Sequence, residues 1–145
     1  MKSKIKKKKL KICIVVANYY PKISEELFIG ASHVLKTNDI KNFRKIEVPG
    51  IFEIPMVIAK NILLYDAFIA LGCVIKGQTY HFEVISDSVG YSLLDLVNSN
   101  PKTLITNGII NANNKNQALK RSKSDNKNKG QEAASALIRM IRCLI

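Results

Sequence analysis

Apolar residues occur along this chain in short continuous runs and at helical spacing. These two patterns predict alternating strands and helices. Four short apolar runs rich in β-branched residues predict strands at 11–17, 43–48, 67–74 and 103–110. The first and third are apolar almost throughout, which is typical of strands buried on both faces of a parallel sheet.

Between the strands, apolar residues recur at helical spacing. Ser24 is predicted to cap the first helix, because its hydroxyl can accept a bond from a free backbone amide. Pro55 is predicted to begin a second helix that continues to Leu64. Later stripes predict a third helix from about Phe82 to Val97, a short one at 116–120 and a last one at 131–144. The last helix should bury Ala133, Ala134, Leu137, Ile138 and Ile141.

This alternation favours an α/β fold, in which parallel strands are joined by helices that cover both faces of the sheet. We expect a flavodoxin-like, three-layer sandwich with a four-stranded parallel sheet in the order 2-1-3-4. Residues 1–10 should form a flexible basic arm, and residues 11–145 a single domain.

The formal net charge of +12 raises the possibility of a nucleic-acid partner. The chain is rich in Lys, Asn and Ile and poor in Arg, a pattern typical of AT-rich coding sequence, and it contains no recognised nucleic-acid-binding module. We therefore expect no nucleic-acid partner. Three cysteines without C-x-x-C spacing fit a reduced, cytoplasmic setting, with Cys13 and Cys73 buried. No apolar stretch is long enough for a membrane helix, so we expect no membrane association.

Polar residues follow the predicted strands. Tyr19 follows the first, Glu53 the second and residues 76–81 the third, and Asn107 is expected near the outer end of the fourth. The carboxyl ends of parallel strands share one edge of a sheet, where ligands commonly bind. Gly77 would let backbone amides approach an anion, and His81 could transfer a proton near neutral pH.

Each of these residues also has a purely structural interpretation. His81 could cap a helix, and Tyr19 could be a core aromatic instead of stacking on a planar ligand. The Glu53 carboxylate could be satisfied by backbone amides or by a polyhydroxylated ligand. The cationic segment 121–129 could be a solvated loop or could complete a phosphate clamp through Arg121. Motifs for dinucleotides, nucleoside triphosphates, serine hydrolysis and zinc proteases do not occur, and two histidines make no histidine-rich metal site.

Four blocks in this order and spacing resemble the 6,7-dimethyl-8-ribityllumazine synthase family. They are VPGIFEIP at 48–55, ALGCVIKGQTYHFE at 70–83, NQALKR at 116–121 and NKGQEAA at 128–134. The resemblance implies condensation of 5-amino-6-(D-ribitylamino)uracil with 3,4-dihydroxy-2-butanone 4-phosphate, releasing phosphate and water, in the penultimate step of riboflavin biosynthesis. It implies no metal and no organic cofactor.

The resemblance also implies roles for individual residues. Tyr19 would stack on the pyrimidine, and Val74 and Ile75 would meet the ring through their backbone. Glu53 would bind the ribityl chain with the amides of Ile51 and Phe52. His81 would move protons as the catalytic residue. The remaining substrate-binding residues would be Gln78, Thr79 and Arg121 at the phosphate, Lys129 in support, and Asn107.

In this family the site lies between subunits of a homo-pentamer, and a 60-subunit shell is possible. Arg121, Lys129 and Asn107 would then reach a neighbour's site. The chain departs from the family at Tyr20, where an asparagine is usual, and at Lys76 and Val84. Its N-terminal segment is also short, so a pentamer is more strongly implied than a shell.

Two alternatives remain. An archaeal-type riboflavin synthase has a similar fold, but its substrate carries no phosphate for the Gly-Gln-Thr turn and Arg121. The other is a catalytically weak shell protein whose lysine-rich arm faces nucleic acid.

Overall fold

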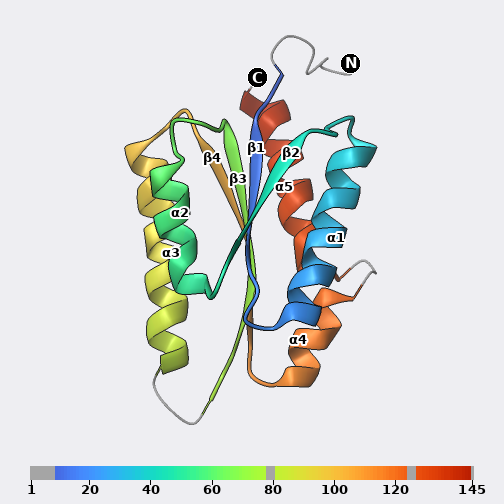
Figure 1. Ribbon diagram of the computed structural model, residues 1–145, viewed down its shortest axis with the longest axis vertical. Coiled ribbons are helices and arrows are strands. Elements are labelled where there is room, and N and C mark those ends of the chain that lie inside the picture. Colours follow the sequence, from blue (N-terminus) through green and yellow to red (C-terminus); the bar gives the residue numbers. More distant parts are fainter. Residues whose placement is uncertain (1–8, 78–80, 124–126, 145) are drawn as a thin grey trace.

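The computed structural model describes residues 9–77, 81–123 and 127–144, and these form one parallel sheet between two layers of helices (Figure 1). The strands are β1 (Ile12–Ala17), β2 (Phe43–Val48), β3 (Ala67–Ile75) and β4 (Leu104–Ala112). The helices are α1 (Pro21–Thr37), α2 (Ile54–Lys60), α3 (His81–Ser99), α4 (Lys115–Ser122) and α5 (Lys129–Leu144), with a 3-10 turn η1 (Ile51–Glu53) before α2.

The sheet has the order β2-β1-β3-β4, and all three pairings are parallel. Helices α1, α4 and α5 cover one face, and α2 and α3 cover the other (Figure 1). The predicted fold class and strand order are therefore confirmed.

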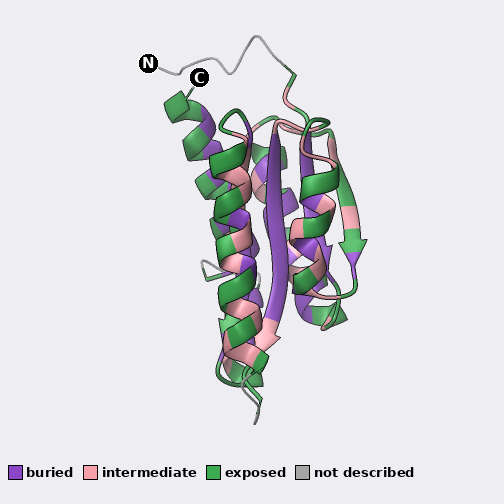
Figure 2. Cartoon of the chain, turned by 90° about the vertical axis from the view of Figure 1, so that its left-hand side faces the viewer, coloured by how far each residue is buried: buried purple, intermediate pink, exposed green. Residues whose placement is uncertain are grey.

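The central strands explain the long apolar runs of the sequence. All six residues of β1 are buried, as are the first seven of β3 (Figure 2). Successive side chains of a strand point to opposite faces. Ile14 of β1 accordingly belongs to the apolar core beneath α1 and α5, and Val15 to the core beneath α2 and α3.

The two largest differences from the predicted helix boundaries lie at the start of α1 and the end of α2. Helix α1 begins at Pro21, which lies in its first turn, and the Ser24 hydroxyl donates to the Ala17 carbonyl instead of capping the helix. Helix α2 ends at Lys60 instead of Leu64, because the Asn61 side chain donates to the Val57 carbonyl (2.8 Å) and the next residues form a turn. By contrast, α5 buries all five predicted residues.

Cys13 and Cys73 are buried as predicted, and burial raises the pKa of each thiol to about 11. Cys143 is exposed near the end of α5. Across the described ranges, no helix has the length and apolar character needed to cross a membrane. No cluster of three potential metal-binding side chains occurs in the same ranges.

Candidate active site

The carboxyl ends of β1, β2 and β3 bring separate segments to one edge of the sheet. Ala17 pairs with Val48, so β1 and β2 end together, and the Asn18 amide donates to the Val48 carbonyl (2.9 Å). Tyr19 follows β1, η1 follows β2, and Lys76 follows β3. This edge is the lower one in Figure 1, and the predicted convergence of these three segments is confirmed.

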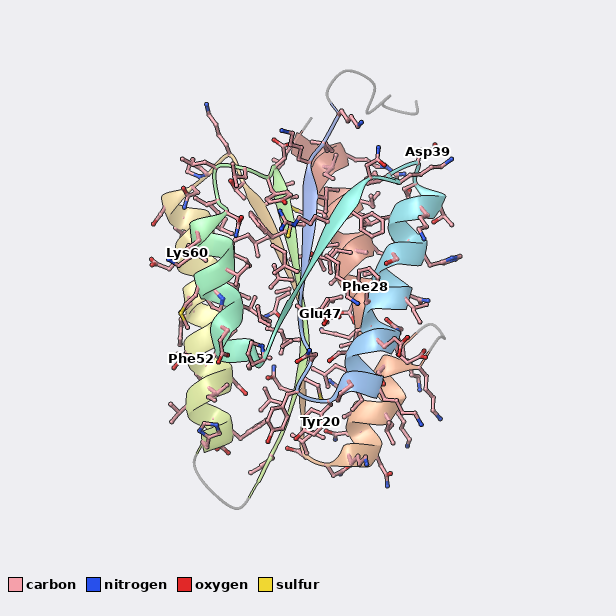
Figure 3. The ribbon with its side chains drawn as sticks, viewed as in Figure 1. Tyr20, Phe28, Asp39, Glu47, Phe52 and Lys60 are labelled. Carbon is pink, nitrogen blue, oxygen red and sulfur yellow. The ribbon has the colours of Figure 1, made fainter. Side chains whose placement is uncertain are left out.

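The turn η1 holds Glu53 at this edge. Ile51 is buried and packs so closely on Gly72 of β3 that a Cβ on this glycine would lie 2.8 Å from Ile51 Cγ2. Phe52, labelled near the lower end of α2 in Figure 3, is 56% exposed. Glu53 is half-buried, and its carboxylate has no hydrogen bond or ion pair within the described residues. Of the two interpretations of Glu53, a carboxylate bound by backbone amides is not seen among the described residues.

The end of β3 offers backbone groups at the same edge of the sheet. The ladder between β1 and β3 ends at the Val16–Leu71 pair, whereas β4 pairs with β3 as far as Ile75. The Lys76 amide donates to Ala112 of β4 (2.8 Å). Adjacent residues of a strand direct their backbone groups to opposite sides, so the N–H and C=O of Ile75 face the side where the β1 ladder has ended. Those groups can meet a planar ligand.

His81 is the first residue of α3 and is exposed. A salt bridge near it joins the residue after β3 to the first turn of this helix. Lys76 Nζ is 3.6 Å from Glu83 Oε1. Glu83 therefore has an ionic partner as well as the helix dipole considered from the sequence. Gln78 and Thr79, the expected phosphate-binding residues, lie outside the described residues.

Tyr19 and Tyr20 have different environments. The Tyr19 ring is 72% exposed, so it is not a core aromatic and is free to stack on a ligand. Tyr20 packs against the core beneath α1, with its ring centroid 5.0 Å from that of Tyr19 (Figure 3). Burial raises the pKa of Tyr20, as do the neighbouring Cys73 and Tyr19. Tyr20 therefore contacts the Tyr19 ring from the side of the core.

Asn107 does not lie at the edge with the other residues, so this prediction was wrong. Strand β4 extends to Ala112, because it pairs with β3 along its whole length, and Asn107 lies in mid-strand opposite Ala70. Its Oδ1 accepts a bond from the Ile109 amide (2.9 Å). Asn107 lines a cleft of about 380 Å³ between α3 and β4, beside Tyr91 and Leu94.

Arg121 and Lys129 lie on the other face of the sheet from His81. Arg121 is exposed in the last turn of α4, and Lys129 begins α5 with its Nζ 3.3 Å from Glu132 Oε1. Helices α4 and α5 pack on the face opposite α3 (Figure 1). The chain alone therefore does not bring these cations to His81.

A cluster of three polar side chains that begins next to Tyr19 was not predicted from the sequence. Asn18 Nδ2 lies 3.5 Å from Glu47 Oε2, and Lys45 Nζ lies 3.0 Å from Glu47 Oε1. The pKa of the Glu47 carboxyl is lowered by the hydrogen bond and the charge of Lys45, and further by Asn18. Lys45 and Glu47 lie two residues apart in the predicted strand 43–48, and this spacing, which puts both on one face, could have indicated the pair.

The model of the 6,7-dimethyl-8-ribityllumazine synthase family matches residues 9–144, nearly the whole chain. The chain belongs to this family. The match includes every described segment of the site, and it confirms the resemblance and the enzyme class expected from the sequence.

Individual members of the lumazine synthase family match over similar lengths. The protein of that name from Bartonella tribocorum is 43% identical over 138 residues, which cover 93% of this chain and 90% of the relative. Lumazine synthases from Zymomonas mobilis and Kosmotoga olearia are each 39% identical, covering 90% of this chain and 93% and 86% of the relatives.

Proposed function

We propose that this protein condenses 5-amino-6-(D-ribitylamino)uracil with 3,4-dihydroxy-2-butanone 4-phosphate to form 6,7-dimethyl-8-ribityllumazine, in the penultimate step of riboflavin biosynthesis. The observation that carries the proposal is the family match over residues 9–144. The geometry supports it, since Tyr19, Glu53 and His81 follow three strands that end at the same edge.

The reaction needs proton transfers at several steps. The aromatic amine adds to the ketone and water leaves to give an imine, inorganic phosphate is then eliminated, and ring closure by the ribitylamino nitrogen releases a second water. A histidine can supply and remove protons near neutral pH. His81 is exposed at the start of α3, so its ring is accessible to a substrate at this edge.

The pyrimidine substrate, 5-amino-6-(D-ribitylamino)uracil, carries two features that the described residues can bind. Its flat pyrimidine would lie between the exposed Tyr19 ring and the backbone at Val74 and Ile75, where the N–H and C=O of Ile75 are open on the side of β1. Its ribityl hydroxyls would donate to the Glu53 carboxylate and meet the backbone of Ile51 and Phe52. Holding the two reactants in this geometry would supply much of the rate, because the amine is already a nucleophile.

The phosphate would be bound by Gln78, Thr79 and Arg121, with Lys129 in support. We propose that Arg121, Lys129 and Asn107 come from a neighbouring subunit of a homo-pentamer, with a 60-subunit shell as a possible larger assembly. Arg121 and Lys129 lie across the sheet from His81, which supports a shared site. Strand β4 is an edge strand, and Tyr91 and Leu94 of α3 beside it are 74% and 64% exposed. These features fit an interface.

The test uses purified protein with both substrates. Lumazine fluorescence and inorganic phosphate should rise together in a one-to-one ratio, faster than without protein, and neither should rise when one substrate is omitted. Phosphate release without lumazine, or a rate equal to that of the uncatalysed reaction, would refute the proposal.

A further inference from the structure

Asn128 is a fully buried polar residue in the loop that leads into α5. A buried amide is costly unless its polar atoms find partners. Asn128 Nδ2 donates to the Ser122 carbonyl (2.8 Å) and to the Glu26 carbonyl (3.1 Å). Its Oδ1 accepts a bond from the Gln131 amide (2.9 Å) and so caps α5.

These three bonds join three helices through a single side chain. Ser122 ends α4, Glu26 lies in α1, and Gln131 lies in the first turn of α5. A carboxylate in this position would keep the cap oxygen but would place lone pairs against two carbonyl oxygens. The arrangement therefore requires a short side chain with both an amide oxygen and an amide nitrogen.

Two glycines make room for this junction. A Cβ on Gly30 of α1 would clash with Asn128 Oδ1, and a Cβ on Gly130 of α5 would clash with the Leu27 carbonyl. The start of α5 thus lies directly against the backbone of α1. Packing this close leaves little freedom for the start of α5. The bond from Asn128 to the Ser122 carbonyl ties the end of α4 to it.

The same junction holds the backbone next to both cations of the proposed phosphate site. Arg121 directly precedes Ser122, whose carbonyl is bound, and Lys129 directly follows Asn128. Given the proposed function, on which this inference rests, we propose that Asn128 is a positioning residue that holds Arg121 and Lys129 in place for the substrate phosphate. It acts through these side chains and does not itself touch the substrate.

The test measures KM for each substrate separately in wild type and Asn128→Asp. Because small displacements of binding groups are costly, we expect KM for the phosphorylated ketone to rise about tenfold or more. KM for the amine should stay within about twofold, and the native mass should not change. The matched control is Asn100→Asp. Asn100 Nδ2 also donates to a backbone carbonyl, that of Leu96 (2.9 Å), but it follows the far end of α3.

A double-mutant cycle separates positioning from folding. If Asn128 acts through Arg121 and Lys129, which are removed together for this cycle, Asn128→Asp should not raise the ketone KM of Arg121→Ala/Lys129→Ala any further. Asn128→Ser keeps a cap oxygen without adding charge and should show the same selective rise. The inference would be overturned if the substitutions had multiplicative effects on the ketone KM, or if both KM values rose in parallel. It would also be overturned by an unchanged ketone KM, or if both Asn128 variants failed to assemble.

The same series tests the proposed function independently. An inactive wild type would refute the proposed function, and an Arg121→Ala variant with no change in ketone KM would refute the proposed role of Arg121 at the phosphate. If both behave as expected and only the Asn128 variants lack the selective effect, the inference about Asn128 alone fails.

Discussion

The edge where three strands end carries three side chains that a ligand can reach, those of Tyr19, Glu53 and His81. Tyr19 is exposed while its neighbour Tyr20 supports it from the core. Glu53 is half-buried next to Gly50, yet its carboxylate has no partner in the described part of the chain. A solvent-accessible acceptor at the edge where strands end can accept hydrogen bonds from ligand hydroxyls without first breaking a bond within the protein.

Arg121→Ala should weaken binding of the phosphorylated ketone selectively. Losing a charged hydrogen bond costs about 2–3 kcal/mol, so KM for this substrate should rise roughly 30- to 150-fold. KM for the amine should change little. Steady-state kinetics with each substrate varied in turn would measure both. Arg139→Ala removes another exposed arginine, from α5, and should leave both values unchanged. Equal rises in both KM values for Arg121→Ala would indicate interface damage instead.

Among the secondary-structure elements, α5 is the one whose burial the sequence predicts best. Leu137 is fully buried and Ile141 nearly so, whereas Leu144 of the same helix is 62% exposed. The core beneath α1 and α5 therefore depends on one stripe of this helix. Removing a buried leucine loses its transfer free energy and also leaves a cavity.

Leu137→Ala should lower the free energy of unfolding by about 2–5 kcal/mol. Leu144→Ala is the matched control, since it makes the same substitution at an exposed position, and it should change stability by less than about 0.5 kcal/mol. Urea unfolding at a fixed protein concentration would compare the two. Similar losses for both variants would mean that the end of α5 is buried in the assembly.

The sequence predicts the strands well, because buried parallel strands are continuous apolar runs with little ambiguity. Helix ends are less predictable: Ser24 has the chemistry of a cap, yet its hydroxyl bonds the Ala17 carbonyl once Pro21 starts the helix. Asn107 was misplaced because the length of β4 depends on its partner β3, which local sequence does not reveal. Local sequence likewise does not reveal that Arg121 and His81 lie on helices that pack on opposite faces of the sheet, because this depends on the tertiary structure.

At the scale of the whole molecule, the candidate site is incomplete in one chain. His81 and Arg121 belong to helices that cover opposite faces of the sheet. The edge strand β4 lies beside exposed apolar residues of α3. A heterologous interface that closes into a ring would bring one chain's His81 face to the neighbour's cations. The proposed pentamer meets this requirement.

Mixed assemblies test the shared site directly. His81→Ala and Arg121→Ala should each be nearly inactive alone at low ketone concentration. If each site takes His81 from one subunit and Arg121 from its neighbour, random co-assembly of equal amounts should restore about a quarter of the sites. Turnover of co-expressed variants would measure the recovery, with separately purified and mixed variants as the control. No recovery in assemblies shown to contain both variants would place the site within one chain.

The most direct test of the central claim compares lumazine formation by wild type and His81→Ala. The wild type should exceed the uncatalysed rate, and His81→Ala should lower kcat by about 10²- to 10⁴-fold, as expected for loss of a proton-transfer group. His33→Ala removes the other histidine, also exposed on a helix, and should retain wild-type kcat. A wild type no faster than the uncatalysed reaction, or a His81→Ala variant with unchanged kcat, would contradict the account.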